Sequence, residues 1–354
     1  MNFGHGGNVD QVSRVYGIDR DSIVDFSANI NPLGLHKNVK EAIVQGICKV
    51  DRYPDITYRD LVETISRHEN INSDYVLLGN GAGEVIFNIA RLLMPRKGLV
   101  FAPSFSEYGD ALNSVGCKIS YYSYGKNFNN VQGVVDYIDD DIDIVFLCNP
   151  NNPTGVLSSR DVLVNIVKKC SEVGAVLVVD ESFLDFIEDK ESISMIGLVD
   201  EFKNLIVVKS LTKFYAFPGI RIGYGITSNT SYIDSYRGVC PPWNVNTLAM
   251  VGAIAAIGEK DYARDSIAYV KAEGDRLYNE LISIKGIQGY KPSVNYIFFR
   301  CLDDIDLKDE LIKRGILIRD CSNYEGLTNG YYRVAVRTKD ENNILINGLK
   351  EVLK

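Results

Sequence analysis

The sequence of 354 residues lacks several patterns that mark other classes of protein. Its seven cysteines form no Cys-x-x-Cys pair and no metal-ligand spacing, so we expect no metal site and free thiols in a reducing cytoplasm. No block of five or more basic residues is present and the formal net charge is −8, which argues against nucleic-acid binding. We find no signal-peptide pattern and no long apolar span, and therefore expect a cytoplasmic protein that does not bind a membrane.

Short apolar runs alternate with helical patterns between about residues 45 and 245. Because 46% of the residues are hydrophobic, a chain of this length can bury a large core and is expected to contain more than one domain. The alternation predicts an α/β fold in which a parallel sheet is covered by helices on both faces. The clearest predicted strands are residues 98–102, 144–148, 176–180, 205–209 and 220–226.

Three segments are expected along the chain. Residues 1–35 are predicted to form an extended N-terminal arm, because the Asn-Pro-Leu-Gly motif at residues 31–34 stops any helix. Residues 36–245 are predicted to form a large α/β domain, in which residues 158–161 resemble a capping box at the start of a helix. A Pro-Pro break is then followed by a long helical region and three strand patterns, which predict a small α+β domain over residues 246–354.

Lys213 follows two hydroxyl residues and precedes an arginine. The apolar strands predicted on either side place it on a loop, and loops at strand ends commonly carry chemistry. A lysine becomes a nucleophile toward carbonyl groups when desolvation or a cationic neighbour such as Arg221 lowers its pKa. Ser210, Thr212 and Arg221 can bind a phosphate. The pattern suits a lysine bound to a phosphorylated aldehyde, although a lone Ser-x-Thr-Lys is also typical of a surface turn.

Three upstream motifs supply the other groups that pyridoxal 5′-phosphate would need. Asp180 ends a buried strand, and a protonated pyridine nitrogen would be a suitable partner for its carboxylate. Asn152 lies in a tight Pro-rich loop and can donate to a phenolate oxygen or a carboxylate. The glycine-rich residues 78–84 precede a helical pattern, whose free N–H groups and dipole favour a phosphate. Individually, these motifs could equally be a helix cap, a turn residue and a glycine turn.

Together, these motifs make the chain resemble the fold-type I pyridoxal-phosphate enzymes of the aspartate aminotransferase superfamily over essentially its whole length. The resemblance implies a mostly parallel seven-stranded sheet and pyridoxal 5′-phosphate as the cofactor. It implies that Lys213 is the covalent attachment point, that Asp180 contacts the pyridine nitrogen and that Asn152 contacts the phenolate oxygen. The implied contacts to the cofactor phosphate come from Ala82, Gly83, Ser210, Thr212 and Arg221.

Two aromatic residues fit the same family pattern. Phe105 matches a residue that stacks on the pyridine ring in family members, although it could also be a core phenylalanine. Tyr53 lies in an Asp-Arg-Tyr-Pro motif and matches a tyrosine that family members lend to the cofactor phosphate of the neighbouring subunit. The resemblance therefore implies a homodimer in which Tyr53 reaches the neighbouring active site.

Two features make the resemblance more specific. The opening His5-Gly-Gly-Asn8 and residues 25–34 resemble the threonine-phosphate decarboxylases of the cobalamin pathway. Aminotransferases of the group usually have a tyrosine where this chain has Phe183, and those decarboxylases also carry phenylalanine. Because phenylalanine cannot donate a hydrogen bond to the cofactor phenolate, the electronics of the bound cofactor should differ. Neutral drift would produce the same substitution without a change of reaction.

Arginines in the C-terminal third predict the substrate site. Residues 331–337 alternate as a strand does, which points Arg333 and Arg337 to one face. Planar guanidinium groups match both carboxylate and phosphate, although each arginine alone could be a solvated surface residue. The resemblance implies that Arg333 holds the substrate α-carboxylate. Arg319 and Arg337 are then candidates for the substrate phosphate, with His5 from the N-terminal arm, and Asn152 is a further candidate substrate residue.

Three functional hypotheses follow. The first is decarboxylation of a small phosphorylated amino acid, L-threonine O-3-phosphate, to (R)-1-amino-2-propanol O-2-phosphate in cobalamin biosynthesis. The second is an aminotransferase that acts on histidinol phosphate or a similar amine. The third is a non-catalytic regulatory protein that binds pyridoxal phosphate. The residues do not show which bond of the substrate α-carbon is aligned for cleavage, so the choice between the first two depends on the resemblance.

Overall fold

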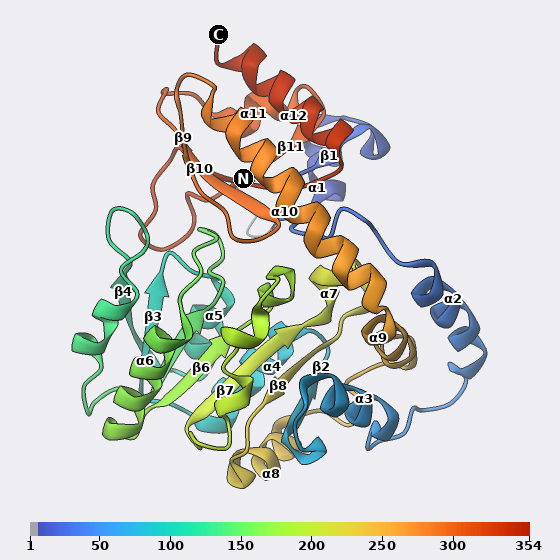
Figure 1. Cartoon of the computed structure of the whole chain (residues 1–354), viewed down its shortest axis with the longest axis vertical. Helices are drawn as coiled ribbons and strands as arrows, with labels where there is room; N and C mark the ends of the chain where they lie inside the picture. Colours follow the sequence, from blue (N-terminus) through green and yellow to red (C-terminus); the bar gives the residue numbers. More distant parts are fainter. Residues whose placement is uncertain (1–5) are drawn as a thin grey trace.

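The structure, a computed structural model, describes residues 6–354 and contains two lobes (Figure 1). The larger lobe is built on a seven-stranded sheet. Four neighbouring strands at one side of this sheet pair with one another only in parallel. The predicted mostly parallel seven-stranded sheet is therefore confirmed. In spatial order the strands are β2 (Val76–Gly79), β8 (Gly223–Ile226), β7 (Leu205–Ser210), β6 (Val176–Asp180), β5 (Ile144–Cys148), β3 (Lys97–Ala102) and β4 (Lys118–Ser123), and β8 runs antiparallel to both of its neighbours.

Helices cover both faces of this sheet, as predicted. The helices of this lobe are α2 (Lys37–Gly46), α3 (Arg59–Glu69), α4 (Ala82–Leu93), α5 (Glu107–Ser114), α6 (Arg160–Val173), α7 (Leu211–Phe214), α8 (Thr230–Val239) and α9 (Thr247–Gly258).

The central strand β6 shows how the sequence builds these layers. Val176 and Val178 belong to a core cluster with α4, α5 and α8, whereas Leu177 and Val179 belong to a second cluster with α6. Because a parallel strand is buried on both faces, its sequence is a continuous apolar run, and the run ends at the polar Asp180. The carboxyl end of the sheet is therefore where polar side chains emerge.

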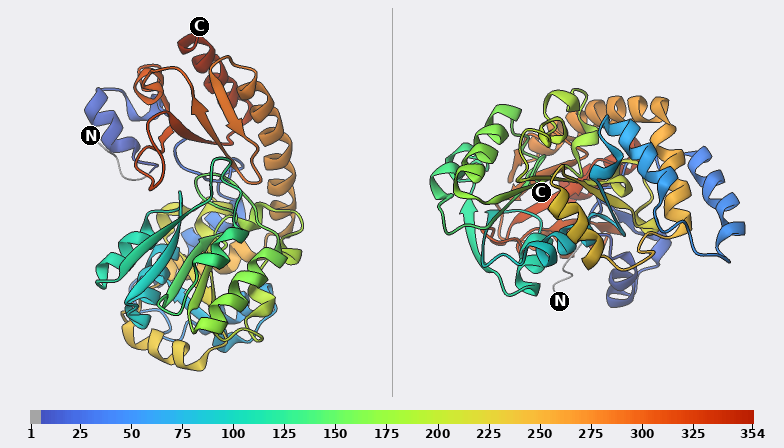
Figure 2. Two further views of the ribbon diagram at one scale, coloured as in Figure 1. Left: turned by 90° about the vertical axis from the view of Figure 1, so that its left-hand side faces the viewer. Right: turned by 90° about the horizontal axis from the view of Figure 1, so that it is seen from below.

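The long helix α10 (Lys260–Ile282) leads from α9 into the smaller lobe (Figure 2). This lobe contains an antiparallel four-stranded sheet and a parallel two-stranded sheet. The four strands in spatial order are β12 (Arg319–Asp320), β13 (Tyr331–Ala335), β10 (Tyr296–Cys301) and β9 (Ile287–Tyr290). The remaining elements are β1 (Val24–Asp25), which pairs with β11 (Ile316–Leu317), and the helices α1 (Val9–Tyr16), α11 (Leu307–Ile312) and α12 (Lys339–Val352).

The N-terminal segment is not extended throughout, so that prediction is wrong over α1. The helix ends at Gly17, whose φ of 66° is left-handed, and the Asn-Pro stop lies too far along the chain to prevent it. Further on, Phe26 O accepts a hydrogen bond from Ala335 N at 2.8 Å. Asn31 Nδ2 donates to Phe214 O at 2.7 Å. These early residues therefore contact both lobes.

Two local predictions in the large lobe are also wrong. The predicted capping box does not form, because Ser159 is the N-cap of α6 and makes no side-chain cap bond. Ser158 instead donates its N–H to Asn149 Oδ1 at 2.7 Å. The strand expected at residues 220–226 begins only at Gly223, since a 3-10 turn occupies Pro218–Ile220.

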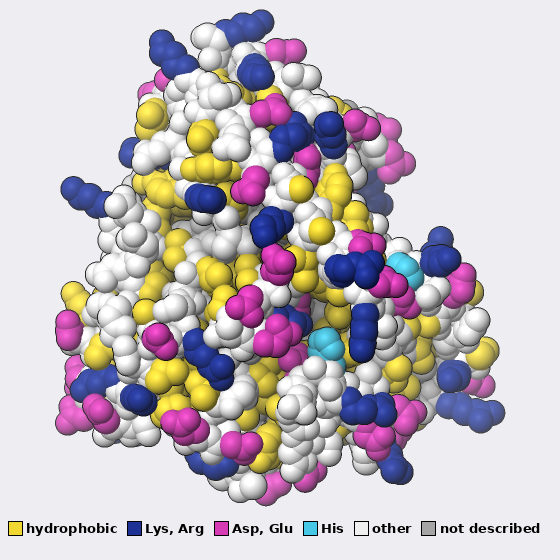
Figure 3. Space-filling view, viewed as in Figure 1, with side chains coloured by type: hydrophobic (Ala, Val, Ile, Leu, Met, Phe, Trp, Pro, Cys, Tyr) yellow, Lys and Arg dark blue, Asp and Glu magenta, His cyan; other side chains and the backbone are white. Residues whose placement is uncertain are grey.

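The surface carries charges of both signs, and the cysteines differ in their exposure. On the face drawn in Figure 3, lysine and arginine side chains lie among aspartate and glutamate side chains. Within residues 6–354, no helix combines the length and apolar character needed to cross a membrane. The same residues contain no cluster of three or more histidine, cysteine, aspartate or glutamate side chains that could hold a metal ion. All seven cysteines are free; Cys48 is exposed, Cys240 is partly buried and the other five are buried.

Candidate active site

A cavity of about 820 Å³ lies at the carboxyl end of the parallel strands and is lined by residues of both lobes. It gathers nearly all of the residues predicted from the sequence, although they are spread over more than 250 positions of the chain. The predicted residues that line it are Ala82, Gly83, Phe105, Asn152, Asp180, Ser210, Thr212, Lys213, Arg221, Arg319, Arg333 and Arg337.

Lys213 lies on the short helix α7 and not on a loop, so that prediction is corrected. Residues 211–214 form a single helical turn, which is too short to produce a helical pattern in the sequence. Lys213 Nζ lies 3.5 Å from Thr212 Oγ1. Burial, followed by the positive charges of Arg221 and Arg333, lowers the pKa of Lys213 from 10.5 to about 8. A substantial fraction of this amine is therefore neutral and nucleophilic near pH 8.

Anion-binding groups surround one end of the cavity. The first turn of α4 begins after Gly81, whose φ of 90° is left-handed, and its N–H groups have no carbonyl acceptor within the helix. Ser210 Oγ and Thr212 Oγ1 lie 2.8 Å apart. The side chain of Arg221 makes no hydrogen bond or ion pair with residues 6–354, and a Cβ atom on Gly81 would lie 2.3 Å from its Nη2. Gly81 thus leaves the space in which this guanidinium lies beside the helix end.

Asp180 lies buried in the wall of the cavity. Its Oδ2 accepts a hydrogen bond from Tyr108 Oη at 2.7 Å, and its Oδ1 accepts one from Ser182 N at 2.9 Å. Burial, with the charge of Asp180, raises the pKa of Tyr108 well above its usual value, so the phenol stays protonated and donates. The ring of Phe105 packs edge-on against Tyr108 at 5.7 Å. Sequence reasoning missed Tyr108, which follows Phe105 by only three residues.

Arg333 is buried where β13 passes the cavity. Its Nη1 donates to Asn152 Oδ1, and its Nη2 donates to Ser27 O at 2.8 Å. Its Nε is buried without a hydrogen-bond partner, and the guanidinium lies 5.4 Å from the ring of Tyr296. The carbonyl of Ser27, which the sequence did not single out, therefore helps to hold this arginine against the early residues of the chain.

The other two predicted arginines approach from neighbouring segments. Arg319 on β12 is paired in register with Arg333, donates to Asn323 Oδ1 at 2.8 Å and lies 5.2 Å from the ring of Tyr324. Tyr324 also lines the cavity and was not predicted. Arg337 does not share the face of a single strand with Arg333, because β13 ends at Ala335. It still lines the cavity, and its Nε is buried without a partner.

Two predicted residues are not brought to this cavity. Tyr53 is 77% exposed and stacks on Trp243 with the ring centres 4.4 Å apart, outside the cavity of its own chain. His5 lies outside the described residues, although the next residues, Gly6 and Gly7, line the cavity. Phe183 also lines it and packs edge-on against Tyr296 at 5.0 Å.

Residues 21–349, which include both lobes, match the family described as aminotransferase class I and II. The chain belongs to this family. This aminotransferase family match begins after α1 and ends within α12, so it includes every cavity-lining residue named above except Gly6 and Gly7.

Relatives within the aminotransferase family carry two different names. The chain is 38% identical to a threonine-phosphate decarboxylase from Salmonella typhimurium over 100% of its own length and 97% of that protein. It is similar to the crystal structure of a histidinol-phosphate aminotransferase from Clostridium acetobutylicum, with 32% identity, a TM-score of 0.87 and coverage of 92% of this chain and 98% of that one. An L-threonine-O-3-phosphate decarboxylase from Porphyromonas gingivalis shares the fold, with 24% identity, a TM-score of 0.85 and coverage of 94% and 99%.

Proposed function

We propose that the chain is a pyridoxal-phosphate-dependent enzyme that decarboxylates L-threonine O-3-phosphate to (R)-1-amino-2-propanol O-2-phosphate in cobalamin biosynthesis. The observation that carries the proposal is that one cavity holds a lysine of lowered pKa, a buried carboxylate and four arginines. The full-length relative that is 38% identical and named threonine-phosphate decarboxylase supports the same substrate. The free cysteines fit a reducing cytoplasm, where we place the enzyme.

The chemistry of the cavity fits each part of pyridoxal 5′-phosphate. Lys213 offers an amine to the aldehyde, and Asp180 offers a carboxylate to the protonated pyridine nitrogen. Arg221, which has no partner within residues 6–354, would bind the phosphate. Further phosphate donors are Ala82, Gly83, Ser210 and Thr212, and Phe105 and Asn152 would contact the ring and its phenolate oxygen. When bound, the cofactor supplies an aldehyde that captures the substrate amine and a ring that withdraws electrons from the α-carbon.

The substrate carries a carboxylate and a phosphate, and the arginines provide matching charge. Arg333 would bind the α-carboxylate, because its unpartnered Nε lies buried at the cavity and its remaining bonds to Asn152 and Ser27 fix the guanidinium plane. Arg319 and Arg337 would bind the phosphate. Because the carboxylate and the phosphate of the substrate would be bound by different arginines, these contacts would fix the orientation of the α-carbon relative to the cofactor. Lys213 Nζ, with a pKa of about 8, can hold or release a proton near neutral pH.

Phe183 is the residue that favours decarboxylation over transamination. It lines the cavity at the position where aminotransferases of the group usually carry a tyrosine, and it brings no hydroxyl group. The competing candidate is a histidinol-phosphate aminotransferase, which the structure from Clostridium acetobutylicum favours through its 32% identity. Both candidates require the same cofactor and a phosphorylated amine, so the reaction itself must decide between them.

The deciding experiment supplies each substrate to the protein loaded with pyridoxal phosphate. We expect L-threonine O-3-phosphate to release CO₂ without any added keto acid. Histidinol phosphate with 2-oxoglutarate should give no glutamate. Glutamate formation without CO₂ release would contradict the decarboxylase and establish the aminotransferase, and the absence of both products would favour a binding protein.

Gly81→Ala is expected to weaken pyridoxal-phosphate binding by about tenfold or more, because the added methyl group must displace the Arg221 guanidinium and strain a backbone with positive φ. Gly116→Ala is the matched control, since its φ of 74° is also positive, a Cβ atom there meets nothing within 4 Å and the residue does not line the cavity. Fluorescence titration of the apoprotein with pyridoxal phosphate measures both affinities. Equal affinities in the two variants would show that the space beside Gly81 does not serve the phosphate.

The capture of pyridoxal phosphate by the apoprotein is expected to accelerate as the pH rises from about 7 to about 9. The amine must be neutral to attack the aldehyde, and the pKa of Lys213 is lowered to about 8. Stopped-flow absorbance across this pH range should show a midpoint near that value. A rate that keeps rising toward the ordinary lysine pKa would mean that burial and the neighbouring arginines do not act on Lys213 in this way.

We also propose that the active unit is a homodimer in which Tyr53 reaches the neighbouring cavity. Tyr53 lies on the surface with Val44, Ile47, Val50 and Ile56, which are each more than half exposed. Val50 lines the same surface hollow as Tyr53 and Trp243, and exposed apolar groups of this kind favour a protein–protein contact. Mixing the inactive Lys213→Ala chain with a Tyr53→Ala chain should restore sites that combine Lys213 of one subunit with Tyr53 of the other. Activity that never exceeds the Tyr53→Ala protein alone would contradict the shared site.

A further inference from the structure

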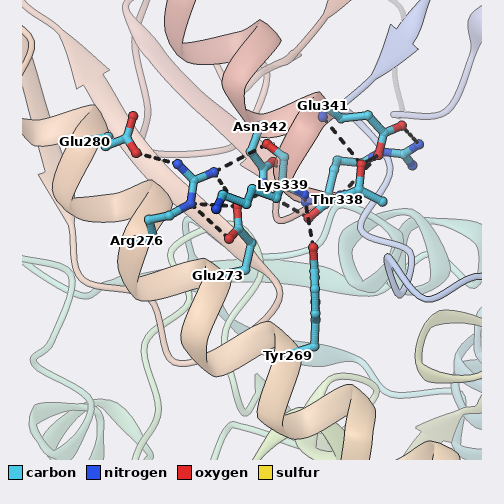
Figure 4. Close-up of polar contacts among 9 residues, drawn as sticks. Tyr269, Glu273, Arg276, Glu280, Thr338, Lys339, Glu341 and Asn342 are labelled. Carbon is cyan, nitrogen blue, oxygen red and sulfur yellow. Dashed lines mark hydrogen bonds and ion pairs between the residues drawn. The ribbon is translucent and has the colours of Figure 1, made fainter.

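A network of charged and polar side chains joins α10 to the start of α12 (Figure 4). Arg276 donates through Nε to both carboxylate oxygens of Glu273, at 2.9 and 3.1 Å, and also pairs with Glu280. Glu273 in turn accepts a hydrogen bond from Asn342 Nδ2 at 2.9 Å. Tyr269 accepts one from Lys339 N at 3.0 Å. The helix that connects the lobes is thus fixed to the first turn of α12.

The network holds the main chain of Arg337 directly. The fully buried Asn342 donates to Arg337 O at 2.9 Å and accepts from Arg337 N at 3.1 Å. These two bonds replace the strand pairing that ends at Ala335. The backbone of Arg337 is therefore fixed at a position from which this residue lines the cavity.

Glu341 holds the side chain of the same arginine. Its Oε1 accepts from Arg337 Nη2 at 2.5 Å, whereas its Oε2 accepts from Thr338 N at 3.1 Å and from Thr338 Oγ1 at 2.6 Å. Burial raises the pKa of Glu341, but the hydrogen bonds from Arg337 and Thr338 outweigh this effect and lower it, so the group is a carboxylate at neutral pH. One carboxylate thus completes the capping box of α12 and fixes one edge of a guanidinium at the cavity.

We propose that Glu341 is a positioning residue for substrate recognition, which aims Arg337 at the phosphate of the substrate, and this inference rests on the proposed function. Glu341 occupies only Nη2, and the Nε of Arg337 is buried without a partner at the cavity wall. A guanidinium held along one edge presents its remaining N–H groups in a fixed plane, which suits a phosphate. The competing explanation is that Glu341 serves only to cap α12.

Glu341→Gln separates the two roles. Glutamine is also a capping-box residue, but its NH₂ group must take the place of one of the two glutamate oxygens, so a donor then faces either Arg337 Nη2 or Thr338 N. We expect the variant with bound cofactor to bind L-threonine O-3-phosphate about tenfold more weakly. Binding of L-threonine should change by less than about twofold, because this ligand has no phosphate group for Arg337 to bind. Titration through the absorbance of the bound cofactor measures both ligands.

Thr338→Ala is the matched control, because it removes the cap oxygen that Glu341 N contacts at 3.4 Å and one donor to Glu341 Oε2, whereas Thr338 N and Arg337 still bind the carboxylate. This control should lower the Tm without changing the preference for the phosphorylated ligand. A second test places Glu341→Gln in an Arg337→Gln background, where its effect on phosphorylated-ligand binding should vanish.

Three results would overturn the proposal. They are equal weakening of both ligands by Glu341→Gln, tighter binding of the phosphorylated ligand, and an effect that persists without Arg337. Because the titration measures binding whatever reaction follows, a wild-type protein that shows this preference but releases no CO₂ would contradict only the proposed decarboxylation.

Discussion

Replacing Lys213 by alanine should abolish turnover of L-threonine O-3-phosphate, with kcat falling by at least about 10³-fold. The variant loses the only amine that lines the cavity among the described residues, and with it the covalent attachment of pyridoxal phosphate and a group able to move a proton. The absorbance of the lysine-bound cofactor should disappear, and borohydride should no longer fix the cofactor to the chain. Steady-state CO₂ release and mass spectrometry of the treated protein measure these effects.

Lys118→Ala is the control for this experiment, since Lys118 is an exposed lysine on the edge strand β4, away from the cavity. Its activity should equal that of the wild type. A Lys213→Ala protein that keeps a borohydride-stable cofactor would mean that another lysine forms the attachment. In that case the assignment of the whole cavity would need revision.

Arg333→Lys is expected to lower kcat/KM for L-threonine O-3-phosphate by about 10²- to 10³-fold. Lysine keeps the charge but cannot donate in one plane to Asn152, to the Ser27 carbonyl and to a carboxylate. Because the buried acceptors lose a donor, the variant should also be less stable by about 1–3 kcal/mol. Steady-state kinetics and urea unfolding with bound cofactor measure the two effects separately.

The neighbouring strand β10 offers a matched control for this substitution. Arg300→Lys makes the same chemical change at an exposed arginine, which lies 5.3 Å from the ring of Tyr331 and does not line the cavity. Its kcat/KM should stay within about twofold of the wild type. If Arg333→Lys changed stability but left kcat/KM intact, Arg333 would be a structural residue and the carboxylate would bind elsewhere.

The parts of the fold that the sequence predicts well are those in which one local pattern has one explanation. The runs ending at Cys148 and Asp180 are continuous and apolar, and each is a parallel strand buried on both faces. The glycine-rich stretch before α4 likewise predicts a helix start, which the structure places at Ala82. The meeting of Asp180, Lys213 and the start of α4 in one cavity could be predicted because these strand and helix ends all lie at one edge of the sheet.

The remaining errors come from contacts that are distant in the sequence or from elements too short to have a period. The serine expected to cap α6 is bound to Asn149, which comes nine residues earlier. Arg337 was assigned to a strand face, although the Thr-x-x-Glu pattern at Thr338 and Glu341 is a sequence signal for a helix start at this point. Tyr108 and the Ser27 carbonyl carry no sequence signal, because their roles depend on Asp180 and Arg333, which lie far along the chain.

The pairing of β1 with β11 has a consequence for the order in which the enzyme can be completed during synthesis. Val24 and Asp25 align with Ile316 and Leu317, and the next residue, Phe26, bonds to Ala335. Because translation proceeds from the N-terminus, residues 24–26 cannot make these pairings until nearly the whole chain has left the ribosome. The sheet that carries Lys213 can form earlier, but the wall of the cavity that contains Arg333 and Ser27 cannot. In a nascent chain, the part of the cavity around Lys213 can therefore fold before the wall that contains Arg333 is in place.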